Sequence, residues 1–205
     1  MKRILSTITL RLFGWRVVQP SHELKRCILI GAPHTSNWDF PLAILGMSAL
    51  NIKAIWVAKK SLFRGPLKYI FNSLSGIPLN RKFCSSFLLE ISYLLKNKDE
   101  RIIAMMPEGT RSKKDYWMPG FYHIAANENI PIALGYIDYK KKIIGIGNVI
   151  QPSTVEADMK IIQDFYFDKV GKVTRNKSEV MLRDKDINKI LERERLKEAI
   201  LLNKI

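Results

Sequence analysis

The stretch KRCILIGAPHTSNWDF, residues 25–40, joins a short apolar run to a polar cluster. The apolar half predicts a buried strand. The polar half holds one histidine, His34, and one carboxylate, Asp39, which would diverge by about 140° on a continuous helix. They can meet if the chain enters a helix near Ser36 or Asn37, because both residue types favour the N-cap. We therefore expect His34 in the loop before a helix and Asp39 in its first turn, with the carboxylate orienting the imidazole.

The rest of the chain alternates between short apolar runs and longer amphipathic stretches. Its 205 residues suit one domain. Strands alternating with helices predict an α/β fold: a single domain with a mixed, mostly parallel sheet flanked by helices. We expect strands at 54–58, 101–105, 131–137 and 142–148, a short extended segment at 77–80, and helices at 40–52, 61–75, about 84–96 and 120–127.

Charge separates the domain from the end of the chain. The formal net charge is +15 and the pI is about 9.9, which implies an anionic partner such as nucleic acid, a membrane surface or a phosphorylated substrate. Residues 176–205 carry eight basic and six acidic side chains, so +13 remains in residues 1–175. The basic excess thus belongs to the domain, which makes a nucleic-acid-binding arm less expected. Residues 176–205 are interpreted as a charged helical tail, and residues 21–175 as the domain.

Residues 1–20 form a third segment, with apolar side chains near helical spacing and basic side chains around them. This pattern predicts an amphipathic helix that either lies in a membrane interface or packs on the domain. The segment is too short and too charged to span a bilayer, and no cleavage site of a signal peptide follows it. The apolar residues are Leu5, Ile8, Leu12 and Trp15, and the basic ones are Lys2, Arg3, Arg11 and Arg16.

Two glycine-containing segments each carry an arginine that could bind an anion. PEGTRS, residues 107–112, follows the expected strand at 101–105, and its glycine allows a tight turn while Arg111 offers a planar fork. Upstream, GIPLNR at residues 76–81 places Arg81 just past a short extended segment. Together the two arginines indicate a phosphate site. Cys27 and Cys84 match no metal or redox spacing, so we predict no metal site and a reducing compartment.

These motifs, in this order, resemble the four sequence blocks of the glycerolipid acyltransferases, typified by 1-acylglycerol-3-phosphate acyltransferase. The first block corresponds to Pro33-His34 through Asp39, the second to Gly76–Arg81, the third to Met106–Ser112, and the fourth to Ile130-Pro131-Ile132. The resemblance covers roughly residues 25–150. Two positions depart from the family pattern: Pro33 stands where the family has asparagine, and Ala133 stands where a second proline is frequent.

Acyl transfer to a glycerol hydroxyl needs a base, and histidine suits that task at neutral pH. His34 is the expected catalytic base, and Asp39 would hold its imidazole in the correct tautomer. No Gly-x-Ser-x-Gly elbow occurs in the chain, which favours direct transfer over an acyl-enzyme. The acceptor phosphate is expected to contact Arg81 and Arg111, with Lys59 nearby. The resemblance adds Glu108 and Gly109 to acceptor binding or to shaping the loop, and Thr110 to acceptor binding; we expect Glu108 to orient Arg111 or another hydroxyl.

The resemblance implies an acyltransferase of phospholipid biosynthesis without metal or bound cofactor, using acyl-CoA or acyl carrier protein as co-substrate. Its partners would be an anionic membrane surface, an acyl thioester and a phosphorylated glycerolipid, at the cytoplasmic face of the cell membrane. Two alternatives remain: a non-catalytic lipid-binding protein with the same fold, and a nucleic-acid-binding protein supported by charge alone. We further expect Trp38 to pack internally, and Trp117 and Phe121 to close the core rather than line an acyl groove. Residues 59–68 suit membrane docking and acyl entry, with a solvated amphipathic helix as the alternative.

Overall fold

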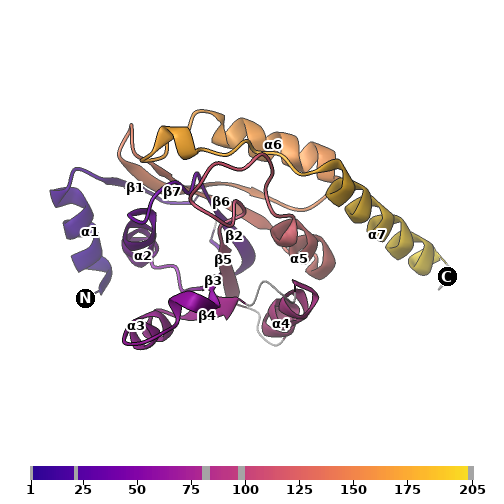
Figure 1. Ribbon diagram of the computed structural model, residues 1–205, viewed down its shortest axis with the longest axis horizontal. Coiled ribbons are helices and arrows are strands. Elements are labelled where there is room, and N and C mark those ends of the chain that lie inside the picture. Colours follow the sequence, from indigo (N-terminus) through magenta and orange to yellow (C-terminus); the bar gives the residue numbers. More distant parts are fainter. Residues whose placement is uncertain (1, 21–22, 80–83, 97–99, 203–205) are drawn as a thin grey trace.

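A computed structural model describes residues 2–20, 23–79, 84–96 and 100–202. These residues form one seven-stranded sheet of order β1-β7-β6-β2-β5-β3-β4 (Figure 1). All neighbouring strands pair in parallel except β6 and β7, which are antiparallel. The expected mixed, mostly parallel sheet is confirmed. The strands are β1 (Arg16–Val18), β2 (Arg26–Ala32), β3 (Ala54–Lys59), β4 (Gly76–Leu79), β5 (Arg101–Met105), β6 (Ile132–Asp138) and β7 (Ile143–Ile150).

Strand β2 lies at the centre of this sheet and has apolar side chains on both faces. Ile28 and Ile30 belong to the larger core, while Cys27 and Leu29 point the other way into a second core. Such a continuous apolar run is what a strand covered on both faces requires. KRCILIGA therefore specifies the middle of the sheet, and the polar cluster after it leaves the sheet at its centre.

Helices cover both faces of the sheet. Helices α4, α5, α6 and α7 pack on the face of Ile28 and Ile30, and α2 and α3 pack on the opposite face, with α1 packed on α2. Figure 1 shows α7 extending past the sheet toward the carboxyl terminus. The helices are α1 (Lys2–Leu12), α2 (Asp39–Ala49), α3 (Leu67–Ser73), α4 (Cys84–Lys96), α5 (Gly120–Glu128), α6 (Val155–Phe167) and α7 (Asp184–Leu202), with short 3₁₀ turns η1 (Lys60–Leu62) and η2 (Thr174–Asn176).

The start of α2 differs from the sequence expectation. The helix begins at Asp39, and the preceding residue, Trp38, occupies the N-cap without a side-chain capping bond. The physical reason is that the Asp39 carboxylate turns back and accepts the backbone amides of Thr35 and Ser36. The Ser36 hydroxyl still accepts the Trp38 amide at 3.2 Å, so the chain turns at Ser36 as predicted, but the regular helix begins three residues later.

Part of the predicted tail belongs to the packed core. Val180 and Leu182 precede α7, and both are buried in the larger core together with Ile190 of α7. Strand β1 and helix α6 were not predicted; β1 has only three residues, too few for a periodic pattern. Within the described ranges, no helix combines the length and apolar character needed to cross a bilayer.

The packing of the tail can be tested with neighbouring residues. Leu182→Ala should lower the free energy of unfolding by about 2–5 kcal/mol, because it removes a side chain that is 3% exposed from the core. The control Met181→Ala, at a side chain 40% exposed, should cost less than about 1 kcal/mol. Urea unfolding of both variants measures the difference. Equal small losses would mean that this segment is not part of the cooperative domain.

Candidate active site

The candidate site lies where three neighbouring parallel strands end. Strand β2 pairs with β6 on one side and with β5 on the other, and all three run in the same direction. Their carboxyl ends therefore meet at one edge of the sheet, the usual position of sites in α/β folds. The chain leaving β2 supplies His34, the chain leaving β5 supplies Glu108, and the chain leaving β6 supplies Tyr139.

His34 and Asp39 form the expected contact. The Nδ1 atom of His34 lies 3.0 Å from Oδ2 of Asp39, and the same Oδ2 accepts the backbone amides of Thr35 and Ser36 at 2.8 and 2.9 Å. The other oxygen, Oδ1, accepts a hydrogen bond from the Tyr139 hydroxyl at 2.7 Å. Both oxygens of this 2%-exposed carboxylate thus accept hydrogen bonds from nearby donors.

The protonation of this pair follows from its contacts. Burial alone would raise the pKa of Asp39, but hydrogen bonds from His34, Tyr139 and Ser36 outweigh burial and hold that pKa below its ordinary value. Asp39 is therefore ionised at neutral pH and favours the tautomer of His34 with a proton on Nδ1, from which the carboxylate accepts a hydrogen bond. Nε2 of the imidazole is then left without a proton and can act as a base.

Glu108 supports the His34 loop from β5. Its Oε1 accepts the backbone amide of His34 at 2.6 Å, and its Oε2 accepts the hydroxyl of Ser178 at 3.0 Å. Burial raises the pKa of Glu108 to about 7, although these hydrogen bonds act in the opposite direction. The hydroxyl that Glu108 contacts is that of Ser178, in the segment before α7. Within the described part of the chain, no contact joins it to Arg111, because its carboxyl group points inward.

The other predicted substrate-binding residues lie around this centre. Gly109 adopts a φ of +66°, which favours glycine, and its amide closes a turn onto the Met106 carbonyl at 3.0 Å. Thr110 accepts the Ser112 amide at 3.4 Å, and Arg111 is exposed. Lys59 is exposed at the carboxyl end of β3, on the same edge of the sheet. Arg81 lies outside the described residues.

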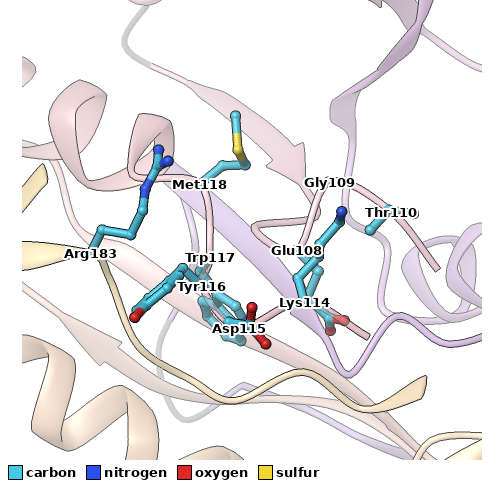
Figure 2. Close-up of a pocket in the computed structure, with 9 residues that line it drawn as sticks. All are labelled: Glu108, Gly109, Thr110, Lys114, Asp115, Tyr116, Trp117, Met118 and Arg183. Carbon is cyan, nitrogen blue, oxygen red and sulfur yellow. The ribbon is translucent and has the colours of Figure 1, made fainter. Parts of the chain in front are cut away.

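A pocket of about 280 Å³ adjoins this region (Figure 2). In the view of Figure 2, Arg183 and Met118 lie at one side of the pocket and Thr110 at the other. The pocket therefore connects the third block to the segment before α7. Its lining comprises Glu108, Gly109, Thr110, Lys114, Asp115, Tyr116, Trp117, Met118 and Arg183.

Residues 171–178 form a strap across the loop that holds His34, and sequence reasoning missed it. The Val173 amide donates to the Thr35 hydroxyl at 3.2 Å, and the Asn176 side chain donates to the Thr35 carbonyl at 3.3 Å. A Cβ atom at Gly171 would lie 2.6 Å from the Thr35 hydroxyl, so the close approach requires glycine there. Ser178, at the end of the strap, binds Glu108. The sequence carries no local signal for these contacts, since their partners lie 70 to 141 positions apart.

The aromatic residues near the site follow the predictions in part. Trp117 and Phe121 lie in the larger core, as expected. The prediction for Trp38 is wrong: this side chain is 61% exposed, and the Lys172 ammonium lies 4.7 Å from its ring centre. The reason is its position at the N-cap of α2, from which the side chain points outward rather than toward the sheet. Among the described residues, histidine, cysteine and acidic side chains form no group of three that could hold a metal ion.

Comparison with known proteins adds two findings. The model of the acyltransferase family matches residues 16–133, more than half of the chain. Among solved structures, the crystal structure of the 1-acyl-sn-glycerophosphate (LPA) acyltransferase PlsC from Thermotoga maritima is similar, with a TM-score of 0.53 and 18% sequence identity. The match covers 80% of this chain and 74% of PlsC, and shows a shared fold. A search of curated proteins by sequence found no match.

The buried Glu108 carboxyl should make stability depend on pH. Its folded pKa of about 7 exceeds the ordinary value of 4.5, so the folded state binds a proton more tightly and loses this stabilisation as pH rises between these values. Relative to Glu108→Gln, the wild type should therefore lose about 2 kcal/mol of unfolding free energy from pH 5 to pH 8. Urea unfolding at both pH values measures this change, and parallel pH curves for the two proteins would contradict it.

Proposed function

Because the chain belongs to the acyltransferase family, we propose that it transfers a fatty acyl chain from an acyl thioester to a hydroxyl of a lysophospholipid such as 1-acylglycerol 3-phosphate. The observation that carries this proposal is the 3.0 Å contact between His34 and Asp39, beside Glu108 of the third block. The acyl donor is acyl-CoA or acyl carrier protein, a co-substrate rather than a bound cofactor. The reaction would serve phospholipid biosynthesis.

The reaction is a direct transfer with His34 as base. Nε2 accepts the proton of the acceptor hydroxyl as its oxygen attacks the thioester carbonyl carbon. The resulting tetrahedral intermediate collapses, so that a C–O bond has formed and the C–S bond breaks. The proton passes from the imidazolium to the leaving thiolate, which restores the neutral imidazole. Asp39 keeps the tautomer and stabilises the imidazolium while it exists.

The acceptor is proposed to carry a phosphate. Lys59 and Arg111 are exposed cations at the edge of the sheet where His34 and Asp39, the catalytic dyad, lie. Arg81, outside the described residues, is proposed as a third phosphate-binding cation. The pocket beside Glu108 adds Lys114 and Arg183, and its volume of about 280 Å³ suits a polar headgroup better than a long acyl chain. The acceptor named for PlsC, 1-acyl-sn-glycerophosphate, supports the same choice.

We place the protein on the cytoplasmic face of the cell membrane, without contact to nucleic acid. Helix α1 packs on α2 through Ser6 and Leu10, and its opposite side exposes apolar side chains. Basic side chains lie on the same helix, as interfacial helices require for anionic headgroups. The exposed apolar residues are Ile4, Leu5, Ile8 and Leu12, followed by Phe13, and the basic ones are Lys2, Arg3 and Arg11.

Acyl transfer should depend on His34. With a radiolabelled acyl-CoA or acyl carrier protein and lysophosphatidate, His34→Ala should lower kcat about 10²- to 10⁴-fold, because no base remains to take the hydroxyl proton. His123→Asn, which changes a half-buried histidine on α5, serves as the matched control and should keep wild-type activity.

The acceptor panel adds glycerol 3-phosphate and a monoacylglycerol without phosphate. A preference for lysophosphatidate would support the proposed acceptor, and equal use of the monoacylglycerol would argue against a phosphate site. Wild-type protein that transfers no label from either donor, yet binds lipid, would favour the non-catalytic lipid-binding alternative.

Membrane binding should depend on the exposed face of α1. In a vesicle sedimentation assay, the variant Leu5→Ser/Leu12→Ser should bind phosphatidylglycerol vesicles with an affinity about 100-fold lower than that of the wild type. The reason is that each leucine buried in the membrane interface raises the affinity roughly tenfold. Leu89→Ser, at an exposed leucine of α4, is the control and should bind as wild type does. If the wild type and both variants bind the vesicles equally, α1 does not contact the membrane and only packs on the domain.

A further inference from the structure

We propose that Tyr139 is a positioning residue of this site, whose hydroxyl holds the Asp39 carboxylate in the orientation that His34 requires. The inference rests on the proposed function, since it assigns a part to a residue that acts through Asp39. Tyr139 Oη lies 2.7 Å from Asp39 Oδ1, and the two residues are 100 positions apart. Tyr139 also lies outside residues 16–133, which the family model matches.

The two oxygens of Asp39 are held unequally. Oδ2 faces His34 Nδ1 and the two backbone amides of the preceding turn, whereas Oδ1 faces the Tyr139 hydroxyl. A hydrogen bond to each oxygen prevents the carboxylate from turning about its Cβ–Cγ bond. Without the hydroxyl, Oδ1 would be a buried anionic acceptor with its donor removed, which is costly and drives rearrangement.

Tyr139 is suited to donate a hydrogen bond to Asp39 because its hydroxyl keeps its proton. Burial raises the pKa of Tyr139 well above its ordinary value, and the hydrogen bond to Asp39 raises it further. The hydroxyl therefore stays protonated at every pH at which the site would work. Among the described residues, the titratable groups that interact with Asp39 include His34, Tyr139 and Glu108, and Tyr139 remains neutral.

The position of the Tyr139 ring is fixed from several sides. Its backbone amide donates to the Val170 carbonyl at 2.9 Å. Its ring meets Trp15 edge-on, with centroids 5.2 Å apart and planes at 85°. The turn that follows is closed by the Asp138 carboxylate, which accepts the amides of Lys140 and Lys141 at 3.0 and 3.1 Å. A ring held in this way can set the orientation of a carboxylate rather than follow it.

The test is Tyr139→Phe in the full chain, because phenylalanine keeps the ring contact with Trp15 and removes only the hydroxyl. With palmitoyl-CoA and lysophosphatidate, kcat should fall about 10- to 100-fold while both KM values stay unchanged, since a lost hydrogen bond to a charged group acts here on the base and not on substrate. Tyr136→Phe removes a hydroxyl from strand β6, which precedes Tyr139; the Tyr136 ring packs on Phe165 rather than on His34 or Asp39, so this variant should keep wild-type kcat. Urea unfolding checks that each variant is folded.

Two further measurements separate positioning from a structural effect. In the Asp39→Asn background, Tyr139→Phe should cost less than about twofold in kcat, because the carboxylate through which it acts is gone. By proton NMR, the His34 Nδ1 proton should give a downfield resonance in wild type that broadens by exchange with water in Tyr139→Phe. Its absence in Asp39→Asn assigns the resonance.

The possible results decide the inference. Unchanged kcat with an unchanged resonance overturns it, as does a rise in KM alone, which would mean that Tyr139 touches substrate. A full additional loss in the Asp39→Asn background overturns it as well. If the wild type transfers no acyl group, the proposed function fails, and the resonance alone decides: broadening supports Tyr139 as the residue that positions the dyad, and no change rejects it.

Discussion

The buried carboxylate of Asp39 is the constraint on which the site depends. An ionised group that is 2% exposed is stable only when hydrogen bonds replace its lost hydration. Three donors come from the five residues before it, and the fourth comes from Tyr139, after strand β6. Local and distant parts of the chain must therefore meet at one point. The parallel pairing of β2 with β6 achieves this, because it brings the carboxyl ends of both strands to one edge.

Glu108, which follows strand β5, is a second buried carboxyl group that joins the His34 loop to the strap of residues 171–178. Its carboxyl group joins the His34 amide to the Ser178 hydroxyl, and the strap also binds Thr35 through Val173 and Asn176. The loop that carries His34 is thus held from the sheet below and from the strap above. Glu108 supports this arrangement from the protein interior, so a substitution there would affect the loop geometry as well as any contact with substrate.

The sequence predicts those features whose signal is local. The strands follow from apolar runs, and the contact of His34 with Asp39 follows from a five-residue spacing with a helix start between them. Tyr139 and Ser178 carry no such signal, because their partners come from distant elements and a lone tyrosine or serine in a loop resembles any other. The prediction for Trp38 fails for a related reason: an aromatic residue inside a motif suggests packing, but the start of α2 turns its side chain outward beside Lys172.

The same packing connects α1 to the dyad. Helix α1 lies on α2, where Ser6 bonds Ser48 at 2.9 Å, and α2 begins at Asp39 itself. Trp15, just after α1, contacts the ring of Tyr139, whose hydroxyl reaches Asp39 from the other side. The exposed apolar face of α1 therefore has a fixed orientation relative to His34. For an enzyme whose acceptor and product are lipids, as proposed here, a rigid connection between the membrane-facing helix and the base would set the height and angle at which the hydroxyl meets Nε2.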